Sequence, residues 1–122
     1  MKITSFNPLI VSNNAPAIVA LFKSMGFERR HLITGIDDKD ITTIRMKNEG
    51  GFYVDIAAAD VPKDLTLIRM NVDDFDEAYE FLISRGFRNS RGEGTVDTPT
   101  NRSAMMISPT GFAFDLCQHI KD

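Results

Sequence analysis

Two stretches of the chain place hydrophobic residues three and four positions apart, a spacing typical of an amphipathic helix. The first stretch contains Ile18, Leu21, Phe22 and Met25. The second contains Phe75, Ala78, Tyr79 and Leu82. Asn13 or Asn14 precedes the first stretch and Asp74 the second, and these residue types cap helix N-termini. Gly26 and Gly86 follow the two stretches, as expected for residues that end a helix in a left-handed conformation.

Shorter segments with alternating or continuous hydrophobic residues predict strands around the two helices. One strand precedes each helix and three follow it, so each half of the chain has the order βαβββ. In the first half the predicted strands are Ile3–Val11, Glu28–Thr34, Ile41–Lys47 and Phe52–Ala57. In the second half they are Leu65–Val72, Phe87–Ser90, Ser103–Ser108 and Phe112–Gln118. The polar segment Arg88–Arg102 is long for a connection and is predicted to be a loop that faces a ligand or moves.

The two halves repeat each other at a constant spacing of sixty residues. Gly26-Phe27 recurs as Gly86-Phe87, and Gly51-Phe52 recurs as Gly111-Phe112. Asn13-Asn14 and Val54-Asp55-Ile56 have their counterparts at the same spacing in Asp73-Asp74 and Phe114-Asp115-Leu116. Four matches in register indicate two copies of one unit. We therefore expect an α+β fold in which residues 1–122 form a single domain of two βαβββ modules, 1–60 and 61–122.

Composition and charge indicate that the chain acts on a small molecule or on a protein partner. The 122 residues are 43% hydrophobic and 25% charged, close to the average of globular domains. A net charge of −3 disfavours nucleic acid, which needs a basic surface, and no hydrophobic run is long enough to span a membrane. Cys117 is the single cysteine, so no disulfide can form within the chain, and the cytoplasm is the expected location.

Alternation along the strands assigns each side chain to one of two faces of the sheet. The face covered by helices is expected to carry Leu9, Val11, Ile44, Met46, Val54, Ile56, Ile68, Met70, Val72, Ala104, Met106, Phe114 and Leu116. The opposite face is expected to carry Phe6, Pro8, Ile10, Arg45, Tyr53, Asp55, Leu67, Arg69, Asn71, Met105, Ala113, Asp115 and Cys117. This second set mixes bulky hydrophobic groups with charges, as small-molecule sites do. The pattern assigns His31 to neither face.

Three motifs carry a resemblance to a known family. They are Val11-Ser12-Asn13 before the first helix, Leu21-Phe22-Lys23-Ser24-Met25-Gly26-Phe27 at its end, and Ser108-Pro109-Thr110-Gly111-Phe112-Ala113-Phe114-Asp115-Leu116 near the end of the chain. With the paired βαβββ order, the chain resembles the glyoxalase/bleomycin-resistance/extradiol-dioxygenase superfamily, also called the vicinal oxygen chelate superfamily. The resemblance implies modules related by an internal pseudo-two-fold, a curved mixed sheet that forms a cleft, and a homodimer.

The metal enzymes of that superfamily take one ligand from the first and one from the last strand of each module. Carried over, these positions are Phe6, Leu67, Asp55 and Asp115. Phenylalanine and leucine cannot bind a metal, and the histidines of the chain fall on none of the four positions. We therefore expect no metal and no cofactor.

Asp55 and Asp115 occupy equivalent positions, and two interpretations remain open for them. They could act as a carboxylate pair in the cleft, serving as a general base or binding a cation. Alternatively each could pair with a basic neighbour, for which Arg45 and Arg69 are the candidates. Either arginine could also bind the carboxylate of a ligand. Cys117 is expected to be a small apolar filler.

The sequence thus favours a metal-independent binding protein that sequesters a drug or metabolite, a small and partly aromatic or cationic organic molecule. The predicted ligand-binding residues are Phe6, Tyr53, Asp55, Leu67, Arg69, Met105 and Asp115. The alternative is a lyase, isomerase or dioxygenase-related enzyme that uses the cleft carboxylates or a non-standard metal site. A regulatory module with a vestigial cleft is a third interpretation, and the sequence does not separate it from the first.

Overall fold

A computed structural model describes residues 1–34, 42–97 and 101–119. The chain forms two compact units. The N-terminal unit is Asn7–Thr66, and the C-terminal unit combines Met1–Phe6 with Leu67–Asp122. The first six residues therefore pack with the second half of the chain. Ile41, the first residue of the predicted strand Ile41–Lys47, lies outside the described residues.

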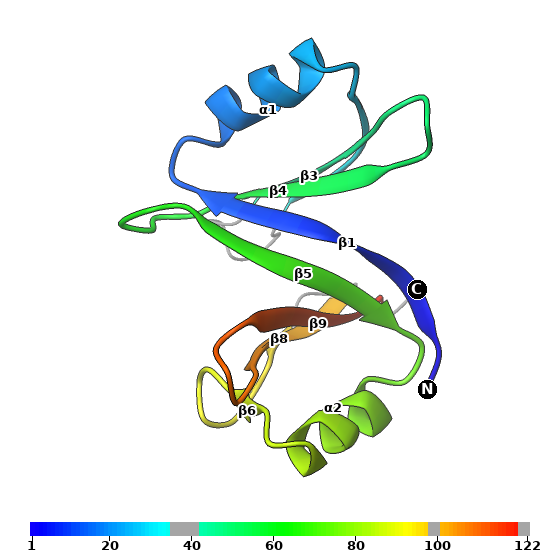
Figure 1. Cartoon of the computed structure of the whole chain (residues 1–122), viewed down its shortest axis with the longest axis vertical. Helices are drawn as coiled ribbons and strands as arrows, with labels where there is room; N and C mark the ends of the chain where they lie inside the picture. Colours follow the sequence, from blue (N-terminus) through cyan, green and yellow to red (C-terminus); the bar gives the residue numbers. More distant parts are fainter. Residues whose placement is uncertain (35–41, 98–100, 120–122) are drawn as a thin grey trace. The chain divides into compact units, whose positions relative to one another are not determined.

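The order of helices and strands confirms the predicted α+β class (Figure 1). The first half contains β1 (Ile3–Ser12), α1 (Ala15–Ser24), β2 (Glu28–Thr34), β3 (Thr42–Lys47) and β4 (Tyr53–Ala58). The second half contains β5 (Leu65–Val72), α2 (Phe75–Ser84), β6 (Arg88–Asn89), β7 (Val96–Asp97), β8 (Asn101–Ile107) and β9 (Ala113–His119). The segment expected to be one long loop thus holds two short strands. Strand β7 pairs with β8, and β6 is shorter than predicted.

In the N-terminal unit the strands lie in the order β2-β3-β4-β1. Strands β1 and β4 are parallel, while β4, β3 and β2 pair antiparallel. Helix α1 lies against one face of these strands (Figure 1). Its Val19 packs into a buried cluster with Met46 of β3 and Ile56 of β4. The hydrophobic stripe predicted for this helix therefore packs on the sheet as expected.

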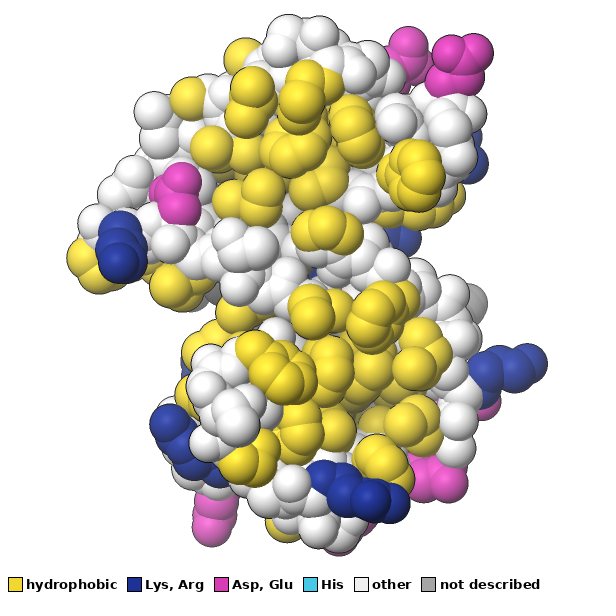
Figure 2. Space-filling view, viewed as in Figure 1, with side chains coloured by type: hydrophobic (Ala, Val, Ile, Leu, Met, Phe, Trp, Pro, Cys, Tyr) yellow, Lys and Arg dark blue, Asp and Glu magenta, His cyan; other side chains and the backbone are white. Residues whose placement is uncertain are grey.

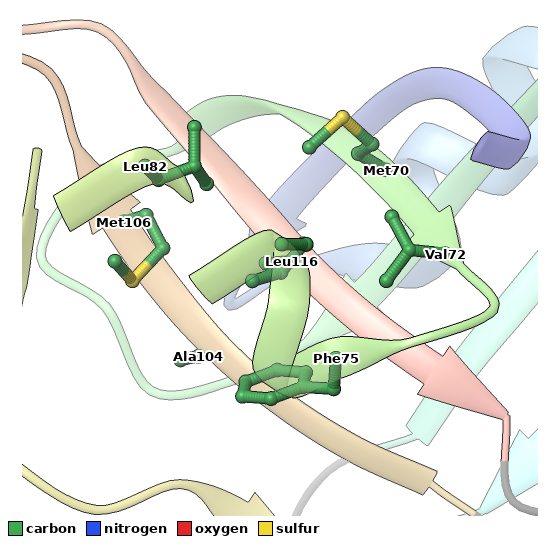
Figure 3. Close-up of a cluster of buried hydrophobic side chains, with 8 residues drawn as sticks. Met70, Val72, Phe75, Leu82, Ala104, Met106 and Leu116 are labelled. Atoms are coloured by element: carbon green, nitrogen blue, oxygen red, sulfur yellow. The ribbon is translucent and has the colours of Figure 1, made fainter. Parts of the chain in front are cut away.

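The C-terminal unit has the same arrangement, with the strands in the order β5-β9-β8-β6. Strands β5 and β9 are parallel, and β9, β8 and β6 are antiparallel to one another in turn. Figure 3 shows the core that results, in which Phe75 and Leu82 of α2 point toward hydrophobic side chains of the strands. Those strand residues are Met70, Val72, Ala104, Met106 and Leu116.

The sixty-residue repeat extends to the hydrogen bonds of individual turns. In the turn before β4, the amides of Gly51 and Phe52 bond to the carbonyl and the side-chain oxygen of Asn48. In the turn before β9, the amides of Gly111 and Phe112 bond in the same way to Ser108. Both glycines have positive φ, +90° and +111°. An asparagine and a serine thus stabilise the same turn, which explains why the motif repeats although this residue differs.

The first six residues add a strand segment to the C-terminal unit. The amide of Asp73 donates to the carbonyl of Lys2 at 3.0 Å, and Nδ2 of Asn71 donates to Oγ of Ser5 at 2.6 Å. The ring of Phe6 lies 6.4 Å from that of Phe114, which packs against the core under α2. Residues far apart in sequence therefore complete one unit.

The predicted faces are correct for β3, β4, β5, β8 and β9 but wrong for β1. Leu9 pairs in parallel register with Asp55 and so shares the face opposite α1, whereas Ile10 packs against the core under α1. Phe6 likewise lies on the side of Phe114, and not opposite it as expected. The reason is that Leu9-Ile10-Val11 is a continuous apolar run, which alternation cannot assign to faces.

Hydrophobic side chains also reach the surface between the helix and the strands of each unit (Figure 2). Phe52 and Phe112, which are equivalent in the repeat, are among the exposed large hydrophobic residues. Each lies at the end of the repeated turn described above, directly before β4 or β9. Within the described ranges, no helix has the length and hydrophobicity needed to cross a membrane.

The glycines that end the two helices offer a matched test of backbone strain. Both have positive φ, +100° at Gly26 and +93° at Gly86. A Cβ at Gly26 would meet no atom within 4 Å, so Gly26→Ala should cost about 1–2 kcal/mol of unfolding free energy from backbone strain alone. A Cβ at Gly86 would lie 2.9 Å from Cγ of Pro109, so Gly86→Ala should cost more.

Urea unfolding followed by circular dichroism measures both costs. Adding Pro109→Ala to Gly86→Ala should bring the two losses closer together, because it removes the atom that the new Cβ would meet. Equal losses for the two single variants would contradict the role given to Pro109.

Candidate functional site

The N-terminal unit carries a polar cluster on the face of its sheet opposite α1. Asp55 of β4 accepts two hydrogen bonds from Arg45 of β3, Nε to Oδ1 at 2.8 Å and Nη2 to Oδ2 at 2.9 Å. Arg45 Nη2 also donates to Oδ1 of Asn7 on β1, at 3.2 Å. The ladder explains this geometry, because Arg45 lies directly opposite Asp55 in the antiparallel pairing of β3 and β4. Three neighbouring strands thus meet at one guanidinium.

Burial is unequal within this cluster. The Asp55 side chain is 1% exposed, and that of Arg45 is 24% exposed. A buried carboxylate requires a positive partner, and a two-pronged contact with arginine is among the strongest available. The carboxylate is therefore held beneath the guanidinium, and a molecule that approaches this face meets the arginine.

The equivalent carboxylate in the C-terminal unit also pairs with an arginine. Arg69 Nε of β5 donates to Oδ2 of Asp115 on β9 at 3.1 Å. Asp115 is more accessible than Asp55, with 14% of its side chain exposed. The thiol of Cys117 lies 3.5 Å from the same carboxylate oxygen. Burial raises the pKa of the Cys117 thiol, and the nearby Asp115 carboxylate raises it further, which fits the predicted role of a filler.

The two arginines are not equivalent in the repeat. Arg45 reaches its aspartate from the antiparallel neighbour β3, and Arg69 reaches its own from the parallel neighbour β5. Sixty residues after Arg45 stands Met105, which lies opposite Asp115, and sixty residues before Arg69 stands Leu9, which pairs with Asp55. The carboxylate is common to both modules, while the strand that supplies its cation has changed.

The predicted ligand-binding residues fall into two groups. Tyr53 and Asp55 lie in the N-terminal unit, and the other five lie in the C-terminal unit. Of these five, the residues on the face opposite α2 are Leu67, Arg69, Met105 and Asp115. Phe6 contacts Phe114 on the other side. A role in ligand binding stays a prediction for all seven.

Sequence reasoning missed two residues of the N-terminal cluster, Asn7 and Lys47. Asn7 is buried beside Arg45, and it stands sixty residues before Leu67. The repeat alone could therefore have identified Asn7, in place of Phe6, as the counterpart of Leu67. Lys47 places its Nζ 5.2 Å from the centre of the Tyr53 ring, and no sequence signal indicated this contact.

The residues at the expected ligand positions do not fit a metal ion. Both carboxylate oxygens of Asp55 accept hydrogen bonds from Arg45, and Leu67 has no donor atom. Among the residues that the structure describes, no group of three or more His, Cys, Asp or Glu side chains could hold a metal. Zinc and similar ions take about four ligands, commonly including imidazole.

Comparison with known proteins identifies the fold. No family model matches the sequence, and no curated protein matches it either. Solved structures do match it. A methylmalonyl-CoA epimerase is 18% identical, with a TM-score of 0.67 and 94% of each chain covered. The methylmalonyl-CoA epimerase from Mycobacterium tuberculosis is 16% identical, with a TM-score of 0.69, 96% of this chain covered and 89% of that one.

A glyoxalase I mutant from Zea mays matches 96% of this chain with a TM-score of 0.67 and 17% identity. The match covers only 43% of that longer chain. The epimerases and glyoxalase I are members of the vicinal oxygen chelate superfamily. This chain has the superfamily fold. The resemblance drawn from the motifs is thereby confirmed at the level of fold, and the superfamily's activities remain a separate question.

The buried ion pair of the N-terminal unit gives a stability prediction. Arg45→Met should lower the unfolding free energy by about 3–5 kcal/mol, because it leaves the Asp55 carboxylate buried without its guanidinium. Methionine is chosen because Met105 occupies the equivalent position. Adding Asp55→Asn should recover much of the loss, since the uncompensated charge is then gone.

The C-terminal unit supplies the matched comparison. Arg69→Leu should cost less than Arg45→Met, because water reaches Asp115 more readily than Asp55. Chemical unfolding of the three variants and the parent protein measures these differences. A cost below about 1 kcal/mol for Arg45→Met would show that Asp55 does not depend on this arginine.

The Cys117 thiol predicts a loss of stability at alkaline pH. Its pKa is raised in the folded protein, so its contribution is fully present below the ordinary thiol pKa of about 8.5 and is lost as pH rises above it. Between pH 8.5 and 10.5, the parent protein should lose up to about 1.4 kcal/mol per pH unit more than the Cys117→Ala variant. Urea unfolding at several pH values measures the difference, and parallel curves would contradict it.

Proposed function

We propose that this chain is a metal-independent binding protein of the glyoxalase/bleomycin-resistance type, which takes up a small organic molecule without converting it. One observation carries the proposal. Asp55 occupies a position at which the superfamily's metal enzymes carry a metal ligand. Its carboxylate is buried and accepts two hydrogen bonds from Arg45. A carboxylate held in this way is a fixed part of the structure and is poorly placed to exchange protons or to bind a metal.

The proposed binding surface is the sheet face opposite the helix in each unit. In the N-terminal unit Tyr53 and Arg45 are the accessible groups, and in the C-terminal unit they are Leu67, Arg69 and Met105. An aromatic ring, aliphatic side chains and charged groups together are typical of small-molecule sites. Phe6 lies on the other side of the sheet, beside Phe114, and its role in ligand binding stays a separate prediction. The predicted homodimer remains part of the proposal.

The structural neighbours support a small-molecule role. One of them is described as a methylmalonyl-CoA epimerase in complex with methylmalonyl-CoA, and it matches 99% of this chain at 15% identity with a TM-score of 0.68. That protein binds a small organic ligand on the same fold. At this identity the likeness shows the fold alone, so the ligand of this chain has to be argued from its own side chains.

An enzyme is the second candidate, and Asp115 favours it. The Asp115 carboxylate is the more accessible of the two aspartates, and the neighbours include the epimerases and glyoxalase I. Its contacts with Arg69 and with the Cys117 thiol make the Asp115 carboxylate part of the folded structure, as the contact with Arg45 does for Asp55. We therefore place binding ahead of catalysis.

Thermal denaturation in the presence of a small-molecule library tests the proposal. A true ligand at about 100 times its Kd should stabilise the protein by about 2.7 kcal/mol, equally with and without EDTA. Elemental analysis of the purified protein should show no stoichiometric transition metal. Stabilisation that disappears with EDTA would contradict the proposal, as would turnover of methylmalonyl-CoA or of a glyoxalase substrate that Asp115→Asn abolishes.

A further inference from the structure

Two cations lie against one aromatic ring on the open face of the N-terminal unit. The Cζ of Arg45 is 5.0 Å from the centre of the Tyr53 ring, and the Nζ of Lys47 is 5.2 Å from it. The strand pairing produces this arrangement, because Lys47 lies directly opposite Tyr53 and Arg45 directly opposite Asp55. A contact between a cation and an aromatic ring thus holds each of the two side chains beside Tyr53.

Arg45 and Lys47, and not the Asp55 carboxylate, are the accessible charged groups on this face. Asp55 is 1% exposed and lies beneath Arg45, so it compensates the guanidinium from below. Lys47 makes no ion pair within the described part of the chain. Glu28 lies directly opposite Lys47 in the pairing of β2 and β3, but its side chain is exposed and forms no ion pair with Lys47. Among the described residues, Lys47 therefore keeps a positive charge with no ion-pair partner, beside an arginine that Asp55 compensates.

The second module shows that the fold does not require these residues. Sixty residues after Arg45, Lys47 and Tyr53 the chain has Met105, Ile107 and Ala113. Those residues occupy the same positions in the β8–β9 pairing, with the same turn between the strands. The carboxylate is kept in both modules, whereas the ring and its two cations occur only in the first. A structural role common to both modules accounts for Arg45, which pairs with Asp55 as Arg69 does with Asp115, but not for Lys47 and Tyr53.

We infer that the open face of the N-terminal unit, at Arg45, Lys47 and Tyr53, binds a small organic anion that carries a carboxylate or a phosphate group. Both positively charged groups lie within 5.2 Å of the centre of one ring, so an anion that approaches this ring is attracted to a lysine without an ion-pair partner among the described residues and to the guanidinium beside it. Arginine and lysine are both established partners of carboxylate and phosphate groups. The inference rests on the proposed binding function and reverses the charge expected from the sequence, which favoured a cation held by Asp55 and Asp115.

Probes of matched shape and opposite charge test the inference. Benzoate and phenyl phosphate are titrated into the ¹⁵N-labelled protein beside benzylamine, and amide shifts of β3 and β4 are followed by NMR. We expect both anions to shift these amides and benzylamine to leave them in place. The ratio of the two anion affinities identifies the preferred oxyanion. Shifts caused by benzylamine alone would overturn the inference.

Variants then separate a built site from general charge. Lys47→Gln should weaken benzoate binding about fivefold, the equivalent of about 1 kcal/mol, and Lys47→Arg should preserve it. Lys63→Gln is the control, because it removes the same charge from an exposed position of the same unit outside its strands. An equal loss in Lys63→Gln would overturn the inference, since binding would then follow net charge.

The outcome also distinguishes this inference from the proposed function. If a neutral or cationic library compound stabilises the protein without metal while the anions leave β3 and β4 unchanged, the anion site is wrong and the binding function stands. If the anions bind at β3 and β4 and a bound substrate is nevertheless turned over, the anion site stands and the proposal of binding without conversion is wrong.

Discussion

A carboxylate near the start of the last strand of each module, buried in Asp55 and half-buried in Asp115, is the constraint on which the arrangement of the open faces depends. Such a group is tolerated inside a protein only with a positive partner within hydrogen-bonding distance. Asp55 meets this requirement with Arg45, and Asp115 meets it with Arg69. The neighbouring strands therefore cannot vary freely, because one of them has to present an arginine at the level of the aspartate.

The two modules show that this constraint has more than one solution. In the N-terminal unit the cation comes from the antiparallel neighbour of the last strand, and in the C-terminal unit from the parallel neighbour. Each solution frees the other neighbouring position for a hydrophobic side chain, Leu9 in one case and Met105 in the other. The two open faces thus carry different side chains around the aspartate although their strand pairings repeat.

The sequence predicted the fold well wherever two signals agreed. The glycines and turn residues repeat at sixty residues, and alternation placed Val54, Ile56 and Leu116 correctly on the helix side. Alternation failed for β1, because three consecutive apolar residues do not show which of them faces the helix. The two arginines were named as candidate partners of the aspartates, but which arginine pairs with which aspartate depends on the register of the strands. The contact of Lys47 with Tyr53 could not be foreseen, because it depends on side-chain conformations that no local pattern specifies.

The placement of the first six residues has a consequence for how the protein folds. Asn7–Thr66 forms one unit from a continuous piece of chain, and its contacts can form as soon as that piece exists. The C-terminal unit instead joins Ser5 to Asn71 across 66 residues and Lys2 to Asp73 across 71. Contacts of such long sequence separation form slowly, since the chain between them must be ordered first. During synthesis the contacts of the N-terminal unit can therefore form before the second half has emerged, whereas Met1–Phe6 reaches its partners only afterwards.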